Sequence, residues 1–524
     1  MKCVFRVDAS VAMGTGHVMR CRTLAKTLKR TGADVKFITR AHPGHLGDRL
    51  ARDGFAVSLL PQPQGSEIKE GSYAAWLGVS QQDDAIQTIH ALENQACDWL
   101  IVDHYGLDQI WEGQVRSHAH KLIVIDDLAN RNHVCDLLLD QNYALAAEER
   151  YRPWVPAHCQ MLIGPRYALL RPEYAQYRET IPPCRGELTR VLVFMGGGNN
   201  ANITCKVLAA LSADQLAHLE VDVVIGANFS HKRGITEQAN ARPNTHIHGP
   251  RSHLADLMSK ADLAIGAGGA TTWERLCIGL PSLVISINEN QVPACKALAS
   301  SGFIHYLGDA HDLDVAAIEL ALVNVLTEPT RLRDLAVSNQ VLVDGQGASR
   351  VAEALIPTRP ADLTIRPAYE TDALIYFVWA NDPMVRSSAN NSEPIDLVTH
   401  LQWFNGKLSD KNCFLYVLEA NGLPIGQVRF DVHGEEATID YSLDILVRGR
   451  GWAKQLVKLG MDKLASRRSV FFKASVKSGN IASAVVFASL GFIETSKDRQ
   501  NGNINFKLGI MAPINKYKSE NSGA

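Results

Sequence analysis

The sequence predicts an α/β protein with two Rossmann-like lobes followed by a smaller α+β domain. Segments with strand and helix patterns alternate over roughly the first 350 residues, as a doubly wound parallel sheet requires. A buried strand that runs into a glycine turn occurs three times in this part of the chain. At 524 residues the chain is also too long for one hydrophobic core.

Composition narrows the class of protein. Lys and Arg total 53 and Asp and Glu total 55, so no basic field indicates nucleic acid or an acidic membrane as a partner. The ten cysteines show no CxxC pair and no metal spacing, which favours a reducing compartment and no metal site. The N-terminus lacks a signal-like apolar segment, and no apolar run is long enough to span a membrane. We therefore expect a cytoplasmic protein.

The first lobe is expected over residues 1–150. Its predicted strands are 2–8, 34–38, 56–60, 99–103 and 121–126. Gly14 and Gly16 permit a tight turn before a helix at 18–30, and unpaired N–H groups at a helix start can bind phosphate or sugar. His17 lies at this position, where it is either a general base or a histidine that only caps the turn.

Two acidic residues follow strands of the first lobe. Asp103 ends one predicted strand, and Asp127 comes directly after the next. Ligands of open α/β sheets bind at the carboxyl ends of the strands, so both carboxylates can face the same crevice as His17. An Asp after a strand is also an ordinary N-cap for the next helix. Both interpretations remain open.

A proline-bearing segment, residues 151–187, is expected to link the lobes. The second lobe is expected over 188–356, with predicted strands at 190–195, 221–225, 245–248 and 263–266. Glycine loops follow the first of these strands at 196–198 and the last at 266–269. Two such lobes would form a cleft with glycine loops on both walls.

The loop at 266–274 gives the clearest indication of a ligand in the second lobe. Gly268 and Gly269 allow main-chain amides to approach an anion, and Thr271 adds a hydroxyl donor. Glu274, in the first turn of the next helix, can accept hydrogen bonds from a ribose diol. The alternatives are plain helix–sheet packing and an acidic residue that is favourable at a helix start without any ligand.

Residues 1 to about 355 resemble the UDP-2,4-diacetamido-2,4,6-trideoxy-β-L-altropyranose hydrolase family of pseudaminic acid biosynthesis, which is similar to two-lobed GT-B transferases. The matching stretches are GTGHVMRC at 14–21, DDL at 126–128, DQN at 140–142, GGG at 196–198, GGATTWE at 268–274 and ENQ at 289–291. The resemblance implies attack of water at the anomeric carbon with inversion and departure of UDP, with His17 as the catalytic base. The substrate-binding positions that it implies are Asp8, Gly14, Gly16, Asn142, Gly197, Gly268, Gly269, Thr271, Glu274, Asn290 and Gln291.

Two other functions fit the first part of the chain. One is a GT-B glycosyltransferase, which would need an acceptor before UDP is released. The other is a nucleotide-sugar sensor that binds without turnover. Product release without an acceptor distinguishes the hydrolase from both.

The pattern changes after 356–360. An α+β domain is expected over 362–510, followed by a polar tail at 511–524. Arg448-Gly-Arg-Gly-Trp-Ala453 separates a strand from a helix, and Asn480, Ser483, Phe487 and Gly491-Phe492 follow downstream. These motifs resemble the GNAT acyltransferases, whose main-chain amides hold the coenzyme A pyrophosphate. The implied acetyl-CoA-binding positions are Leu446, Arg448, Gly449, Arg450, Gly451, Trp452, Ala453, Asn480 and Ser483.

One departure from the GNAT pattern bears on mechanism. Many members have a tyrosine general acid where this chain has Phe487, so the proton donor for the leaving thiolate is open. Asp440 and Glu436 are candidate bases, although each also fits a surface or paired carboxylate. Trp379, Trp403 and Phe404 are candidates for an acceptor pocket or for the core.

The two resemblances together imply one pathway. In pseudaminic acid synthesis a UDP-linked 4-amino sugar is N-acetylated from acetyl-CoA, and the product is then hydrolysed from UDP. We therefore expect a UDP-linked amino sugar and acetyl-CoA as ligands. Tethering would raise the local concentration of the intermediate only if the two sites can face each other.

Overall fold

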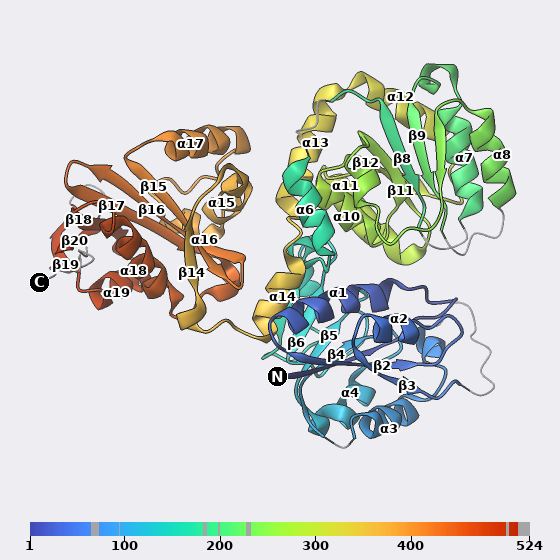
Figure 1. Cartoon of the computed structure of the whole chain (residues 1–524), viewed down its shortest axis with the longest axis horizontal. Coiled ribbons are helices and arrows are strands. Elements are labelled where there is room, and N and C mark those ends of the chain that lie inside the picture. Colours follow the sequence, from blue (N-terminus) through green and yellow to red (C-terminus); the bar gives the residue numbers. More distant parts are fainter. Residues whose placement is uncertain are drawn as a thin grey trace, which may run out of the picture. The chain divides into compact units, whose positions relative to one another are not determined.

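The computed structural model describes residues 1–63, 73–93, 95–181, 186–196, 200–226, 232–498 and 502–511. The chain forms two compact units, Met1–Ile356 and Pro357–Ala524 (Figure 1). Among the predicted positions, Gly197 and the tail beyond Met511 lie outside the described residues.

The first lobe contains a parallel sheet in the order β3-β2-β1-β4-β5-β6-β7. Its strands are β1 (Lys2–Val7), β2 (Asp34–Arg40), β3 (Ala56–Leu60), β4 (Cys97–Asp103), β5 (Ala119–Ile125), β6 (Leu137–Asp140) and β7 (Gln160–Ile163). Its helices are α1 (Gly16–Arg30), α2 (Gly47–Arg52), α3 (Gln81–Ala91), α4 (Gln109–Val115) and α5 (Ala147–Tyr151). The strand order reverses between β1 and β4, and this switch point is where doubly wound sheets bind ligands.

The first sheet continues beyond residue 150. β7 pairs in parallel with β6, so part of the segment expected to be a linker belongs to this sheet. Both strands have only four residues, too few for a clear strand pattern in the sequence. The chain then enters α6 (Pro172–Thr180), whose Tyr174 is buried in the core of the second lobe.

The second lobe has a parallel sheet in the order β10-β9-β8-β11-β12-β13. Its strands are β8 (Arg190–Phe194), β9 (Glu220–Val224), β10 (Thr245–His248), β11 (Leu263–Ala267), β12 (Ser282–Ser286) and β13 (His305–Asp309). Its helices are α7 (Ala201–Leu211), α8 (Lys232–Ala241), α9 (Ala255–Met258), α10 (Thr271–Ile278), α11 (Val292–Ser300), α12 (Val315–Thr327) and α13 (Pro329–Leu342). The loop at 268–270 leaves β11 next to β8, at the switch point of this sheet.

The chain finally returns to the first lobe. α14 (Gly347–Leu355), which the sequence analysis places in the second lobe, packs against α1 (Figure 1). The indole Nε1 of Trp99 in β4 donates to the carbonyl oxygen of Leu355 at 3.0 Å. Periodicity along a helix shows that one face is apolar but not which lobe that face contacts.

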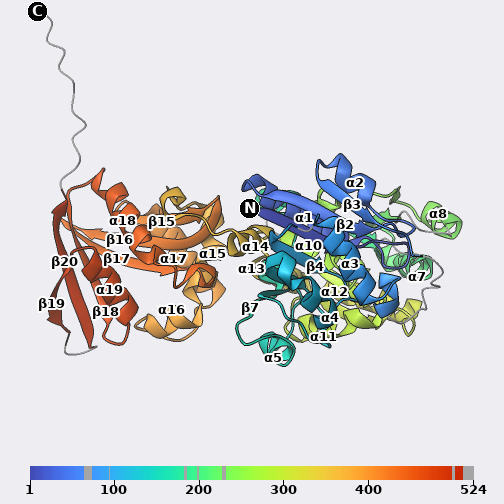
Figure 2. The same ribbon diagram turned by 90° about the horizontal axis from the view of Figure 1, so that it is seen from below.

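The second unit is built on a mixed sheet in the order β14-β15-β16-β17-β18-β20-β19, with β19 at its edge (Figure 2). Its strands are β14 (Thr364–Pro367), β15 (Cys413–Ala420), β16 (Leu423–His433), β17 (Glu436–Leu443), β18 (Val470–Lys477), β19 (Ile493–Lys497) and β20 (Asn503–Met511). Its helices are α15 (Ala373–Ala380), α16 (Pro383–Ser388), α17 (Leu397–Ser409), α18 (Trp452–Ala465) and α19 (Ile481–Ser489). The predicted fold class, two Rossmann-like lobes followed by an α+β domain, is confirmed.

The pairing of β17 with β18 is short. These strands run parallel and pair only from Glu436 opposite Phe471 to Thr438 opposite Lys473. β17 stays paired with β16 as far as Leu443. Residues 439–443 of β17 therefore have one backbone edge that is not paired with β18.

Candidate active sites

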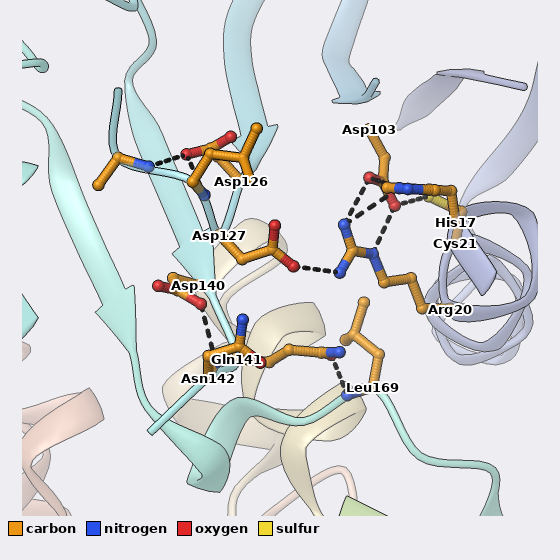
Figure 3. A network of polar contacts seen from close by, with 12 residues as sticks. His17, Arg20, Cys21, Asp103, Asp126, Asp127, Asp140, Gln141, Asn142 and Leu169 are labelled. Carbon is orange, nitrogen blue, oxygen red and sulfur yellow. Dashed lines mark hydrogen bonds and ion pairs between the residues drawn. The ribbon is translucent and has the colours of Figure 1, made fainter. Parts of the chain in front are cut away.

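The first candidate site lies at the carboxyl ends of β4, β5 and β6, beside the start of α1 (Figure 3). His17 is the second residue of α1, so the helix start fixes its position. The preceding Gly14 has a φ of 77°, which a non-glycine residue rarely adopts, and Gly16 begins the helix. Among the described residues no side chain caps the N-terminus of α1, so its first N–H groups remain available to a ligand.

A short hydrogen bond joins His17 to Asp103. The ring atom Nδ1 lies 2.6 Å from Oδ1 of Asp103, which is fully buried. A carboxylate at this distance requires a proton on Nδ1, so the contact of Nδ1 with Arg20 Nη2 at 3.2 Å is not a hydrogen bond. In the neutral ring the lone pair is then on Nε2, which makes this nitrogen the one that can accept a proton.

Arg20, one turn further along α1, grips the same carboxylate. Its Nε and Nη2 atoms donate to the two oxygens of Asp103, each at 2.7 Å. Burial by itself would raise the pKa of Asp103, but the charge of Arg20, and then that of His17, holds this pKa well below its usual range. Asp103 is therefore an anion that orients the imidazole.

Arg20 also reaches Asp127, whose Oδ2 lies 3.4 Å from Nη1. Asp103 and Asp127 thus face the same site as His17, as one of the two sequence interpretations expected. Asp140, at the end of β6, accepts a hydrogen bond from the backbone of Asn142 at 2.8 Å. Burial, and then the charge of Asp127, raises the pKa of Asp140 to about 7.

Aromatic rings that the sequence analysis did not single out surround His17. Tyr105 meets the imidazole edge-on at a centroid distance of 4.6 Å, and Trp76 does so at 6.4 Å. Tyr73 packs against both, at 4.9 Å from each. These residues lie in connecting segments, where neither periodicity nor a motif identifies them.

Asp8 lies in the interior. It is 1% exposed, pairs with Arg6 Nη1 at 2.6 Å and accepts from the backbone of Arg40 at 2.7 Å. Arg6 and Arg40 in turn pair with buried Asp84. Asp8 therefore belongs to a buried ion network in this structure, and its expected contact with the substrate stays a prediction.

In the second lobe the glycine loop is packed closely against α11. A Cβ on Gly268 would lie 2.3 Å from Cys295 Sγ, so only glycine fits. Gly269 is next to the amide of Gln291, whose Oε1 accepts from the backbone of Ile287 at 3.1 Å. Thr271 opens α10 and accepts from Arg275 at 3.3 Å. Asn290 is exposed.

A buried arginine that no sequence motif indicates lies behind this loop. Arg275 is 2% exposed and donates to the carbonyl of Ala267 and to Thr272, both at 3.0 Å. Burial lowers its pKa to about 10, so it remains charged at neutral pH. Its charge adds to the positive end of α10 beside the loop.

Glu274 is held by a neighbouring cation. Its Oε1 lies 3.4 Å from Arg171 Nη2, and burial raises its pKa.

Contacts between the lobes bring the residues around His17 and those of the glycine loop toward each other. The hydroxyl of Tyr143, next to Asn142, donates to Ser301 at 2.9 Å. Burial raises the pKa of Tyr73, and the charges of Asp127 and of Glu289 in the second lobe raise it further.

The second unit presents a bare helix start. Gly449 and Gly451 have φ values of 79° and 77°, and Gly451 precedes α18 without a side-chain cap. A Cβ at either glycine would meet nothing within 4 Å. This loop fits a pyrophosphate, because its amides are accessible and the helix dipole favours an anion.

The other predicted coenzyme positions differ in what they can contribute. Leu446 and Trp452 are buried core side chains, so only their backbones can face a ligand. Arg448 pairs with Asp382 at 2.8 Å, and the guanidinium of Arg450 stacks on Trp452. Ala453 is in the first turn of α18. Asn480 caps α19 by accepting from the backbone of Ser483 at 3.1 Å.

A cavity of about 440 Å³ opens in this unit. It is lined by Tyr376, Ala380, Val385, Arg386, Asn391, Ile395, Thr399, His400, Trp403, Gln427, Arg429, Asp440 and Ser442. Asp440 is 3.0 Å from Arg429, and the Arg429 guanidinium lies over the Trp403 ring.

The remaining candidates do not line this cavity. Trp379 and Phe404 are buried in the core, and Glu436 pairs with Lys473 and Lys507. Neither a cluster of three or more metal-ligating side chains nor a helix able to span a membrane is found among the described residues.

Fold and sites define the class of each unit. Residues 362–493 match the acetyltransferase (GNAT) domain family, which supports acetyl-CoA as the co-substrate of the second unit. The first unit is a pair of Rossmann-like lobes with an aspartate–histidine pair and a glycine loop at their switch points.

Among the proteins similar to this chain are three sequence relatives and a solved structure. An uncharacterized protein of Methanocaldococcus jannaschii is 23% identical over 96% of this chain and 98% of its own. The spore coat polysaccharide biosynthesis protein SpsG of Bacillus subtilis is 25% identical over 66% of this chain and 96% of its own. The UDP-2,4-diacetamido-2,4,6-trideoxy-beta-L-altropyranose hydrolase of Campylobacter jejuni is 24% identical over 58% of this chain and 98% of its own. The crystal structure of MurG from Acinetobacter baumannii covers 68% of this chain and 98% of its own, at 16% identity and a TM-score of 0.49.

Proposed function

We propose that the first unit hydrolyses a UDP-2,4-diacetamido-2,4,6-trideoxyhexose to UDP and the free sugar. The observation that carries this proposal is the hydrogen bond of 2.6 Å between His17 and buried Asp103. It supplies a general base whose tautomer and orientation are fixed. The Campylobacter jejuni relative, whose name states this reaction, supports the choice of substrate.

In this reaction His17 takes a proton from water through Nε2 while the water oxygen attacks the anomeric carbon and the bond to UDP breaks. The configuration at this carbon inverts because attack and departure occur on opposite faces. A base of this kind contributes roughly 10²–10⁴-fold to the rate. Arg20 holds Asp103, which orients the ring, and the Gly269 amide with the Arg275 charge stabilises the diphosphate as it leaves.

We infer that the second unit N-acetylates the UDP-linked 4-amino sugar that precedes this substrate. The match to the GNAT family and the uncapped start of α18 support the use of acetyl-CoA. The cavity that Asp440 and Trp403 line is large enough for a sugar ring and combines a carboxylate with an aromatic face. The chain would then carry two successive steps of pseudaminic acid biosynthesis in the cytoplasm.

Isotope labelling tests the hydrolysis. The full chain is incubated in ¹⁸O-water with the UDP-diacetamido sugar and no acceptor, and the products are analysed by mass spectrometry. Label on the anomeric oxygen of the free sugar supports cleavage of the glycosidic bond. Label on phosphate, or no product without an acceptor alcohol, contradicts the proposal.

A further inference from the structure

In the second unit, the residue that donates a proton to the leaving thiolate is an open question. A tyrosine hydroxyl lies beside the position where many members of the family have this donor. The position of the family's tyrosine is Phe487, which is 2% exposed and carries no proton to give. Its ring meets that of Tyr441 edge-on, with centroids 5.8 Å apart. The Tyr441 hydroxyl donates to Ser483 Oγ at 3.0 Å. A phenol from strand β17 therefore reaches the first turns of α19 beside Phe487.

Tyr441 lies where β17 and β18 no longer pair. Pairing ends at Thr438, three residues before Tyr441, and the backbone edge of β17 beyond this point is not bonded to β18. An extended chain with amide groups, such as the pantetheine arm of coenzyme A, can hydrogen-bond to such an edge. The Tyr441–Ser483 contact joins β17 to α19 next to this gap.

The two faces of β17 have different surroundings. Successive side chains of a strand point to opposite faces. Asp440 and Ser442 therefore line the cavity of about 440 Å³, here called the acceptor cavity, while Tyr441 points toward α19. A thioester placed in the gap between the strands would meet the amine from the cavity side. The thioester sulfur would then be accessible to the Tyr441 hydroxyl, on the side of the sheet that α19 covers.

We propose that Tyr441 replaces the missing tyrosine of α19 as the proton donor to the sulfur of coenzyme A. As the amine forms the C–N bond and the C–S bond breaks, Tyr441 gives its proton to the sulfur. The phenolate regains a proton from water through the Ser483 hydroxyl. The proton that the amine loses leaves through the acceptor cavity, so protons balance over one turnover.

The environment of Tyr441 suits this role. Burial raises the pKa of Tyr441, so the phenol is protonated throughout the physiological range. The inference rests on the acetyltransferase function proposed above, because a donor is needed only if a thiol leaves. It concerns the sulfur and not the acceptor, so coenzyme binding can test it without knowing which amine is acetylated.

Binding of the coenzyme provides the first test. Wild type and Tyr441→Phe are titrated with CoA and with desulfo-CoA by calorimetry. We expect wild type to bind CoA about three- to tenfold more tightly than desulfo-CoA, the effect of one hydrogen bond to sulfur, and the variant to lose this preference. An equal preference in both proteins would overturn the proposal. A wild type that shows the preference but acetylates no UDP-amino sugar would contradict only the function proposed above.

Turnover provides the second test. Tyr441→Phe should lower kcat by about 10²-fold or more, whereas the KM for acetyl-CoA should rise by no more than about tenfold, the effect of the lost hydrogen bond. Adding Phe487→Tyr to this variant should restore part of the rate by returning a hydroxyl to the same gap. Tyr416→Phe is the matched control, because the Tyr416 hydroxyl is buried in the same unit and has no hydrogen-bond partner in the part of the chain that the structure describes. Wild-type kcat in Tyr441→Phe would overturn the proposal.

Discussion

His17 and Asp103 form a hydrogen-bonded pair across the switch point of the first sheet, with Nδ1 2.6 Å from Oδ1. They are 86 residues apart and come from the start of α1 and the end of β4. The side chain of His17 is 12% exposed, whereas that of Asp103 is fully buried. The imidazole of His17 therefore lies between the buried carboxylate of Asp103 and the solvent-accessible side of the site.

Loss of the imidazole should abolish sugar release but not UDP binding. We expect His17→Ala to lower kcat by roughly 10²–10⁴-fold, because water then lacks a base, while the Kd for UDP stays within a few-fold of wild type. Turnover is measured as UDP release, and Kd by calorimetry. His120→Ala, a change at an exposed histidine of β5, serves as control. Near-normal turnover in His17→Ala would remove this residue from the role.

Asp103 should act through His17. Asp103→Asn keeps the shape but loses the charge that fixes the proton on Nδ1, so kcat should fall at least tenfold with little change in KM. Arg20 would lose its main partner, and we expect the free energy of unfolding to decrease by about 1–3 kcal/mol.

Asp53→Asn is the matched control, because it removes an Asp–Arg pair with Arg22 on the same helix away from His17. It should destabilise the protein without lowering kcat. Equal losses of kcat in both variants would show that the effect of Asp103→Asn is structural.

Asp140 should make stability depend on pH. Burial and the charge of Asp127 raise its pKa from 3.8 to about 7, so between these values the folded state binds more protons than the unfolded state. The free energy of unfolding should therefore fall as pH rises from about 4 to 7, by at most about 4 kcal/mol from this group. Asp140→Asn should remove this slope and be more stable than wild type at pH 8. Chemical denaturation at several pH values measures both effects. An unchanged slope would contradict the assignment.

The glycine turns and the position of His17 at a helix start could be predicted from the sequence, because both depend on local chemistry. Gly14 and Gly451 take positive φ values that few other residues adopt. A histidine next to a predicted helix start can be recognised from the sequence alone. The sequence could not decide the role of Asp103, because an N-cap and a site carboxylate look the same until β4 is placed beside β1.

Other features depend on packing between distant segments. Asp8 was expected in the site, yet Arg6 and Arg40 draw it into the interior. The aromatic residues around His17 lie in connections that have no clear sequence period, and β7 is too short to show one. Arg275 follows Glu274 in a helix, and only its contact with Ala267 shows that it supports the glycine loop.

The coenzyme loop of the second unit can be tested with two glycines of similar backbone conformation. Gly451 has a φ of 77° and Gly434, in the β16–β17 turn, has a φ of 62°, and a Cβ at either would meet open space. Both changes to Ala should cost about 1 kcal/mol in stability. Only Gly451→Ala should also weaken CoA binding, by about tenfold or more, because its methyl group would occupy the space beside the α18 amides. Similar Kd values in the two variants, measured by calorimetry, would contradict the assignment of this loop.

Substitutions of the two candidate carboxylates of the second unit, Asp440 and Glu436, should differ in their effect on acceptor binding. Asp440 lines the acceptor cavity and is 52% exposed, whereas Glu436 is held by Lys473 and Lys507 outside it. An ammonium group about 4 Å from a partly solvated carboxylate gains about 1–4 kcal/mol, so Asp440→Asn should raise the KM for the amine acceptor about tenfold or more. Glu436→Gln should change this KM less than twofold. The measurement is acetyl transfer at saturating acetyl-CoA, with thermal unfolding of each variant to verify the fold. A larger effect of Glu436→Gln than of Asp440→Asn would mean that the amine does not bind in this cavity.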